Sequence, residues 1–339
     1  MQPIITRRLL LGATATGLAM PGLLAPGTAR ADAVPLPPDA KAFGATVAAM
    51  GKAPKPLRLA MLSFQGSSFW EAVDKGITAG KAYLAPLGST VDYIQLGTAL
   101  TAEAVVTGID GALAKQYDGI ATIPIFDGTV AKVNEAVADG VPFVAFIADS
   151  AQRSNRTVGM GTKAYDAGKE AGTFIIKQLD GHGKIAVITG YLGAAQHMQR
   201  MNGALDLIRK TAPGIAILGP FECKDDDATA YSQATDAMTS NPDLKIIYVT
   251  AGGSEAAAKA VHDANANGRV GVVGYDDLPE KQKYKQEGEI LALIDQAPSR
   301  QSFDSLVILH NILGFKAHYP SDIPIPSPVA YGKFARARV

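Results

Sequence analysis

From residue 57 onward, short apolar runs alternate with amphipathic stretches of helical periodicity, and this alternation constrains the fold more than any other feature. The first run, 57–63, is followed by a stretch in which Trp70, Val73 and Ile77 recur near helical spacing. Apolar runs that alternate with helices are typical of parallel sheets covered by helices on both faces. We therefore expect an α/β protein built from doubly wound parallel sheets.

The alternation of strands and helices runs through the chain twice. The first pass predicts strands at 57–63, 91–96, 119–123 and 141–147 and helices at 68–87, 101–116 and 128–138. The second pass predicts strands at 184–189, 215–221, 246–250, 270–275 and 290–295 and helices at 164–179, 196–210, 229–239, 254–266 and 299–313. The proline-rich stretch at 321–329 is expected to be an edge strand or a connector, because proline donates no ladder hydrogen bond. Two successive α/β lobes of similar size follow from this pattern.

The N-terminus carries a separate signal. A basic region at Thr6-Arg7-Arg8 precedes the uncharged stretch 9–24, and Ala29-Arg30-Ala31 supplies small residues for cleavage. This order is typical of a secretory signal peptide, and the paired arginines suggest the twin-arginine type. A permanent anchor helix is the alternative, which the glycines and prolines of the apolar stretch disfavour. Residues 1–31 are therefore predicted to be removed on export to the periplasm.

Charge and cysteine content exclude several classes of function. The chain has 32 basic and 32 acidic residues, and the predicted signal peptide contains three arginines and no acid. The mature protein is therefore expected to be slightly acidic, without an electrostatic footprint for nucleic acid. Cys223 is the single cysteine, so no intramolecular disulfide is possible, and we interpret it as a small buried residue.

Patterns for catalysis and for cofactor binding are absent from the sequence. The run 252–256 lacks the last glycine of a nucleophile elbow, and Gly159-Met160-Gly161 is only the start of a dinucleotide fingerprint. None of the five histidines has a second histidine or a cysteine at zinc-ligand spacing. Asp225-Asp226-Asp227 is interpreted as a helix N-cap rather than a calcium site. We therefore expect a protein that binds a ligand without enzymatic activity, cofactor or metal.

Polar and aromatic residues gather at the carboxyl ends of the predicted strands or just beyond them, where open parallel sheets bind ligands. These candidates are Ser63, Ser67, Phe69, Trp70, Asp149, Ser150, Arg200, Asp276 and Gln296, with His197 at a helix start nearby. A neutral sugar needs this mixture, because its hydroxyls require polar partners and its apolar ring face packs well on an aromatic ring. A buried polar group without a partner costs about 1–3 kcal/mol.

Each candidate also has an alternative structural interpretation. Trp70 fits a core position on a helix face as well as it fits a ligand-stacking position. Asp149 and Asp276 have the positions of ordinary helix or turn caps, and Arg200 that of a solvated helix residue. The ligand-site interpretation therefore depends on all of them lying at the same end of different strands.

A family resemblance covers nearly the whole mature chain. From residue 57 onward the chain resembles the periplasmic binding proteins of the ribose and galactose type, also called type I or cluster B. In that family a serine ends the first strand ahead of two aromatics, as Ser63 precedes Phe69-Trp70 here. Its Gly-Phe-Asp strand end is similar to Gly274-Tyr275-Asp276, and its Gln-x-Pro hinge element is similar to Gln296-Ala297-Pro298.

Two further segments resemble the family but depart from its pattern. The segment 197–203 resembles the arginine-bearing helix of the family, and in a strict alignment the ligand arginine falls on Met198 rather than Arg200. The Asp-Arg pair of the fourth strand becomes Asp149-Ser150. By this resemblance Met198 joins the candidate ligand residues, and a sugar other than ribose is equally compatible with the site.

The resemblance implies two lobes joined by a three-segment hinge with crossings near Val158, Gln296 and Ile325. The N-terminal lobe is expected to contain 57–158 and 297–325, and the C-terminal lobe 159–296 and 326–339. Residues 32–56, which are rich in proline, alanine and glycine, are expected to form a flexible or peripheral leader.

The implied function is that of a monomeric periplasmic protein that captures a small neutral sugar or sugar-like ligand between its lobes. Its expected partner is the membrane permease of an ABC import system. A periplasmic sensor that presents its ligand to a chemoreceptor or sensor kinase is an alternative that the sequence leaves open. A cytoplasmic repressor is disfavoured by the signal peptide and by the lack of an N-terminal helix-turn-helix, and an enzyme by the lack of catalytic patterns.

Overall fold

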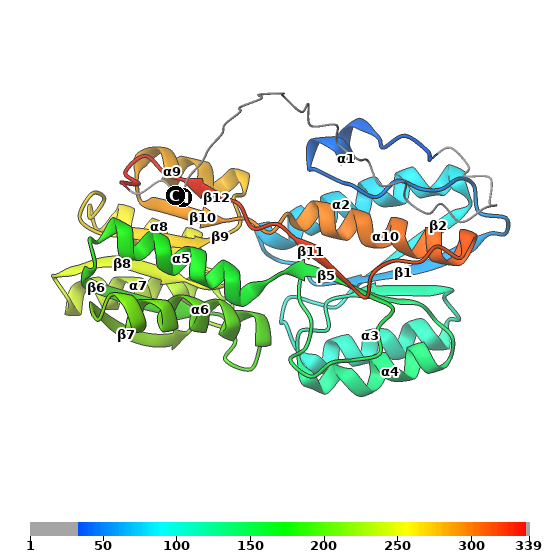
Figure 1. Cartoon of the computed structure of the whole chain (residues 1–339), viewed down its shortest axis with the longest axis horizontal. Helices are drawn as coiled ribbons and strands as arrows, with labels where there is room; N and C mark the ends of the chain where they lie inside the picture. The colour runs from blue at the N-terminus through cyan, green and yellow to red at the C-terminus, as the bar shows by residue number, and fades with distance from the viewer. Residues whose placement is uncertain (1–32, 337–339) are drawn as a thin grey trace, which may run out of the picture. The chain divides into compact units, whose positions relative to one another are not determined.

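The computed structural model describes residues 33–336, which form two six-stranded sheets with helices on both faces of each (Figure 1). The predicted α/β fold class is therefore confirmed. The predicted signal peptide, its twin-arginine motif and its cleavage site lie outside the described residues.

The first sheet has the strand order β11-β5-β4-β3-β1-β2, and all of these neighbours pair in parallel. Its strands are β1 (Leu57–Ser63), β2 (Ser89–Gln95), β3 (Gly119–Thr122), β4 (Phe143–Ala145), β5 (Val158–Thr162) and β11 (Asp322–Ile325). One face is covered by α2 (Ser68–Leu84) and α10 (Pro298–Phe315), and the other by α3 (Ala102–Ala114) and α4 (Val130–Ala138) (Figure 1). All residues of β1 except Arg58 are buried, as an apolar run in a two-sided sheet requires.

The second sheet has the strand order β12-β10-β9-β8-β6-β7, and only β12 runs antiparallel to its neighbour. Its strands are β6 (His182–Thr189), β7 (Gly214–Glu222), β8 (Leu244–Val249), β9 (Gly271–Tyr275), β10 (Ile290–Ile294) and β12 (Val329–Tyr331). The helices that cover it are α5 (Ala164–Gln178) and α6 (Ala195–Thr211) on one face, and α7 (Asp227–Ser240) and α8 (Ser254–Asp263) on the other. Each face has its own apolar cluster.

Helices α5 and α6 approach each other closely because glycine stands at their crossing. A Cβ atom at Gly168 would lie 2.1 Å from the carbonyl oxygen of Arg200, and one at Gly203 would lie 2.0 Å from that of Tyr165. Any side chain at either position would separate the two helices. This contact brings the backbone of Arg200 directly against α5.

The structure differs from the sequence-based prediction at β5. The predicted lobe boundary at 158–159 falls inside this strand, which pairs with β4 and β11 in the first sheet. The glycines at 159 and 161 made a strand pattern hard to recognise. The proline-rich stretch behaves as predicted, because β11 is the edge strand of the first sheet and contains Pro324.

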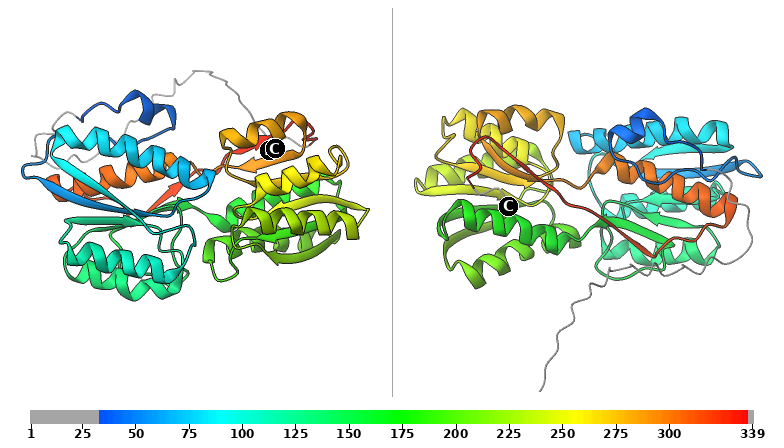
Figure 2. Two further views of the ribbon diagram at one scale, coloured as in Figure 1. Left: turned by 180° about the vertical axis from the view of Figure 1, so that it is seen from behind. Right: turned by 45° about the horizontal axis from the view of Figure 1, so that its top comes forward.

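The leader was expected to be flexible or peripheral. Its contacts show that it is peripheral and held in place. Helix α1 (Pro38–Ala42) lies against α2 (Figure 2). The backbone amides of Thr46 and Val47 donate to the carboxylate of Asp304 at 3.1 Å, and that of Met50 donates to Asn311 Oδ1 at 2.9 Å. Asp304 is fully buried. The expectation of flexibility is therefore corrected: the segment is a strap packed along α2 and α10.

Candidate functional site

A cavity of about 130 Å³ lies at the carboxyl ends of strands from both sheets. Its lining contains Ser67, Phe69 and Trp70 from the first sheet's loops and helices, and Arg200, Asp276 and Gln296 from the second's. The structure thus brings together six of the candidate residues that the sequence singled out. Their position agrees with the rule that open parallel sheets bind ligands beyond their carboxyl edges.

The side of the cavity that the first sheet provides combines aromatic and aliphatic residues with uncharged polar ones such as Ser67 and Thr98. The Trp70 ring lies 4.9 Å from that of Phe69 and 5.4 Å from that of Phe64, measured between centroids. Ile123, Ile125 and Ile147 follow β3 and β4 on the same side. Trp70 is only partly buried and packs against the first core cluster while it lines the cavity, so its two alternative roles are compatible.

The side that the second sheet provides contains a hydrogen-bonded triad of buried residues, which we call the polar triad: Arg200, Gln296 and Asp276. The Arg200 guanidinium donates to Gln296 Oε1 at 2.8 Å, and Gln296 Nε2 donates to Asp276 Oδ1 at 2.7 Å. All three side chains are at most 5% exposed. The guanidinium also lies 4.1 Å from the centroid of the Tyr275 ring and donates to the carbonyl oxygen of Thr250.

Two features of the polar triad indicate a ligand. Among the described residues, Arg200 Nε is buried and has no hydrogen-bond partner, although such donors are nearly always satisfied. Asp276 follows β9 in the left-handed region, with φ of 66°. A non-glycine residue in this region marks a turn that the surrounding structure maintains, often at a functional site.

His197 lies beside the polar triad at the start of α6. Its Nδ1 accepts a hydrogen bond from the backbone amide of Tyr191 at 3.0 Å, which leaves Nε2 as the protonated nitrogen of the neutral ring. Burial lowers the pKa of His197, and the carboxylate of Asp225 acts in the opposite direction. At neutral pH the ring is therefore uncharged and can donate one hydrogen bond.

Several charged residues of the cavity were missed by the sequence analysis. Lys224, Asp225, Asp227, Glu255 and Lys281 line it, all from the second sheet's side. Asp226 caps α7 as predicted, with its side chain accepting from Thr229 N. Asp225 instead accepts from Gly252 N at 2.9 Å, and burial raises the pKa values of Asp227 and Glu255. Lys224 and Asp225 have positive φ, and no sequence pattern indicated that turn.

Ser63 and Met198 do not line the cavity. Ser63 is fully buried at the end of β1, where its hydroxyl donates to the carbonyl oxygen of Phe64 at 3.4 Å. Met198 packs against the core between α6 and the second sheet. Of the two alternatives on α6, the structure therefore places Arg200, and not Met198, at the cavity.

Asp149 and Ser150 also lie outside this cavity. Strand β4 is short, and Ile147 after it has φ of 67°, so the chain turns away before Asp149. The Asp149 carboxylate pairs with Arg156, whose guanidinium also bonds to Asp322 at 2.6 Å. Asp149 therefore ties the loop after β4 to β11, and Ile147 occupies the place at the cavity where an acid was expected.

Ile147 also connects the two sheets. Its backbone amide donates to Gln301 Oε1 on α10 at 2.8 Å, and its carbonyl oxygen accepts from Gln196 Nε2 on α6 at 2.9 Å. Gln301 Nε2 in turn donates to the carbonyl oxygen of Gln296 at 2.7 Å. These bonds hold the cavity wall in a defined position between elements of both sheets.

Two sequence features that could have indicated catalysis or nucleotide binding have structural positions instead. Burial raises the pKa of the Cys223 thiol to about 12, so this residue is a protonated, buried side chain rather than a nucleophile. Gly159-Met160-Gly161 lies within β5 and forms no phosphate-binding turn.

Within residues 33–336, no helix has the length and apolarity required to cross a membrane.

Fold and cavity together define a class of protein in which two doubly wound sheets share one site for a small ligand. A model of the periplasmic binding protein domain matches residues 60–317. The chain therefore belongs to the periplasmic binding protein family, whose members bind their ligands without catalysis.

Curated relatives and solved structures agree with this assignment. The D-allose-binding periplasmic protein of Escherichia coli K12 is 27% identical over 248 residues, covering 70% of this chain and 78% of the relative. A D-ribose/D-allose-binding protein of Pseudomonas aeruginosa is 25% identical over 245 residues, covering 66% and 70%. The glucose-galactose binding protein GanP of Geobacillus stearothermophilus superimposes with a TM-score of 0.73 at 25% identity, covering 82% of this chain and 98% of GanP.

Proposed function

We propose that the exported protein captures a small neutral sugar or sugar-like ligand between its two sheets and delivers it to the permease of an ABC importer. The observation that carries this proposal is the polar triad facing an aromatic wall across one cavity. Asp276 accepts, Arg200 donates, and Trp70 offers a ring face to the apolar face of a sugar. The sugars named for the relatives support the same ligand class.

The residues that we assign to the ligand are Ser67, Phe69, Trp70, Arg200, Asp276 and Gln296, with His197 and Asp225 added on the charged side. Asp276 and Asp225 would accept hydrogen bonds from ligand hydroxyls and Arg200 would donate to them, and such charge-assisted bonds are stronger than neutral ones. Because Ile123, Ile125 and Ile147 line the opposite wall, the bound molecule should turn its less polar face toward the first sheet.

The lobe boundaries that we propose follow the sheets. The first crossing comes after β5, beyond Thr162, the second lies near Gln296, and the third lies between β11 and β12. A three-segment hinge of this kind would let ligand binding shift an equilibrium between open and closed forms.

Export is proposed from the N-terminal sequence, with mature protein beginning near Asp32 and located in the periplasm. The naming of the Escherichia coli relative as periplasmic supports this location. N-terminal sequencing of the protein recovered from the periplasm would show Asp32 first, whereas a membrane fraction that retains Met1 would contradict the proposal.

The function is tested by calorimetric titration of the mature protein with D-allose, D-ribose, D-arabinose, D-galactose and D-fucose, followed by mass spectrometry of the recovered sugar. We expect saturable binding of one sugar molecule per chain and recovery of that sugar unchanged. Steady conversion of the sugar, or the absence of binding to every neutral sugar together with binding of a charged metabolite, would contradict the proposal.

A further inference from the structure

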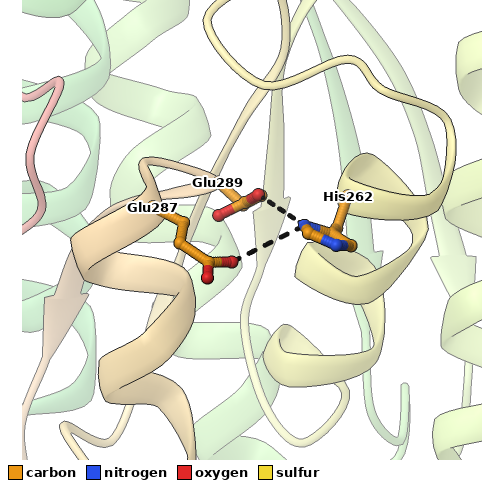
Figure 3. A group of neighbouring side chains, drawn as sticks. All are labelled: His262, Glu287 and Glu289. Carbon is orange, nitrogen blue, oxygen red and sulfur yellow. Dashed lines mark hydrogen bonds and ion pairs between the residues drawn. The ribbon is translucent and has the colours of Figure 1, made fainter.

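Outside the ligand cavity, the structure brings together one histidine and two glutamates on the outer side of the second sheet. His262 lies at the end of α8, Glu287 at the end of α9 (Gln282–Glu287), and Glu289 directly before β10. Figure 3 shows the three side chains pointing toward one another from these elements. Glu255, which lines the ligand cavity, is seven residues from His262, or about 10 Å along the helix axis.

We infer that His262, Glu287 and Glu289 form a binding site for Zn²⁺, an ion that the proposed sugar-binding function does not require. His262 Nδ1 lies 2.9 Å from Glu289 Oε1 and 3.6 Å from Glu287 Oε2. Zinc bonds of the usual length in a tetrahedral arrangement separate neighbouring ligand atoms by about 3.3 Å. The two measured distances lie on either side of this value, so small side-chain movements suffice to accommodate the ion.

The carboxylates provide an independent indication of a missing cation. Glu289 is fully buried, and its second oxygen, Oε2, is buried without a hydrogen-bond partner among the described residues. Glu287 Oε2 is likewise buried and makes no hydrogen bond there. Among residues 33–336, no lysine or arginine lies within ion-pair distance of either glutamate, and both carboxylates contact His262. The hydrogen bond with His262 satisfies Glu289 Oε1 and leaves Oε2 without a partner, which is costly in a buried carboxylate.

The donor set selects the type of ion. One imidazole nitrogen with two carboxylates suits Zn²⁺, whereas Ca²⁺ and Mg²⁺ prefer sites built from oxygen ligands alone. The side chains of His262 and Glu287 are 45% and 41% exposed, so the ion can enter from solvent and a water molecule can complete a fourth position. Bound zinc would tie the end of α8 to the start of β10 and stabilise the second sheet.

The test uses the tag-free mature protein after dialysis against a chelator, with Zn²⁺ or Mg²⁺ added and the bound metal counted by mass spectrometry. We expect one Zn²⁺ per chain and a rise in Tm of about 5 °C at saturating Zn²⁺, with no shift in Mg²⁺. His262→Ala and Glu287→Gln should each weaken Zn²⁺ binding by at least about tenfold, because each removes one of three protein ligands. His318→Ala, at an exposed histidine elsewhere, is the matched control and should bind Zn²⁺ like the parent.

Glu289→Gln is a second variant, and because Glu289 is buried its folding must be checked by circular dichroism before titration. The inference is overturned if the parent binds no zinc at millimolar concentration. It is also overturned if His262→Ala and Glu287→Gln bind zinc as tightly as the parent. Both outcomes are independent of sugar binding, since none of the three residues lines the ligand cavity.

Discussion

The two sides of the ligand cavity differ in chemistry although they come from sheets of the same architecture. The first sheet's side contributes Trp70, Phe69, three isoleucines and uncharged polar residues such as Ser67 and Thr98, but no charged residue. The second sheet's side contributes every charged residue of the lining, including Arg200 and Asp276. Both sheets place their loops at equivalent strand ends, so the difference arises from the side chains and not from the fold.

This difference indicates how a small cavity can hold a neutral polar ligand. Buried charged groups are tolerable when they have hydrogen-bond partners, and Gln296 bonds to both Arg200 and Asp276 before any ligand arrives. The aromatic and aliphatic residues of the opposite side then supply contact area without a requirement for hydrogen-bond partners. We infer that the second sheet orients the hydroxyls and that the first excludes water from them.

The largest effects are expected from breaking the polar triad, and the first of them is at its centre. Gln296→Leu leaves the Arg200 guanidinium and the Asp276 carboxylate without their shared partner, so we expect ligand affinity to fall roughly 100-fold. The free energy of unfolding without ligand should fall by about 2–3 kcal/mol. Calorimetry and urea denaturation measure the two effects. Unchanged affinity would show that the polar triad is only structural.

A smaller loss is expected on the apolar side. Trp70→Ala removes the aromatic face and should weaken binding about tenfold, equivalent to roughly 1.4 kcal/mol. Trp70→Phe keeps a ring and is the matched control, with affinity within about threefold of the parent. If Trp70→Ala weakened binding more than Gln296→Leu, the assignment of hydroxyl recognition to the second sheet would be wrong.

The pH dependence of stability distinguishes the second sheet's side further. Because burial lowers the pKa of His197, the unfolded chain binds this proton more tightly than the folded protein does. The free energy of unfolding therefore has its full value above about pH 6.5. It falls as the pH drops from there toward the pKa of His197 in the folded protein. In His197→Asn, which keeps an acceptor for Tyr191 N–H, the free energy of unfolding should depend less on pH. His318→Asn is the control, and the dependence that remains belongs in part to His310, whose pKa burial also lowers.

The smallest effect on binding is expected at Asp149. Its carboxylate pairs with Arg156 outside the cavity, so Asp149→Ala should change ligand affinity by less than about twofold. Because the pair is partly exposed, its loss should lower the free energy of unfolding by no more than about 1 kcal/mol. A large loss of affinity in this variant would show that the loop after β4 reaches the ligand.

The sequence predicted the strand and helix order because burial on two sides leaves clear apolar runs, as in β1, whose predicted and observed bounds coincide. It missed β5, where Gly159 and Gly161 remove the side chains on which such patterns depend. It also missed the packing of the leader, because the bonds between Thr46 and Asp304 join segments 258 residues apart.

Prediction of the candidate site had a similar limit. Residues directly at strand ends, such as Asp276 and Gln296, were found from the strands themselves. Asp225 and Lys281 reach the cavity through turns, and Asp149 is turned away from it by the positive φ of Ile147. Such backbone reversals at non-glycine residues depend on tertiary contacts that a local pattern does not contain.

Ligand titrations of Asp276→Ala and Asp149→Ala, each with the melting curve of the ligand-free protein, test whether the polar triad binds the ligand. For Asp276→Ala we predict a loss of affinity of about 30- to 150-fold, because a buried charge-assisted bond contributes roughly 2–3 kcal/mol. The ligand-free protein should lose only about 1 kcal/mol, from its bond with Gln296. Unchanged affinity in Asp276→Ala with a lowered melting temperature would contradict ligand binding by the polar triad, since Asp276 would then be a structural residue of the turn after β9.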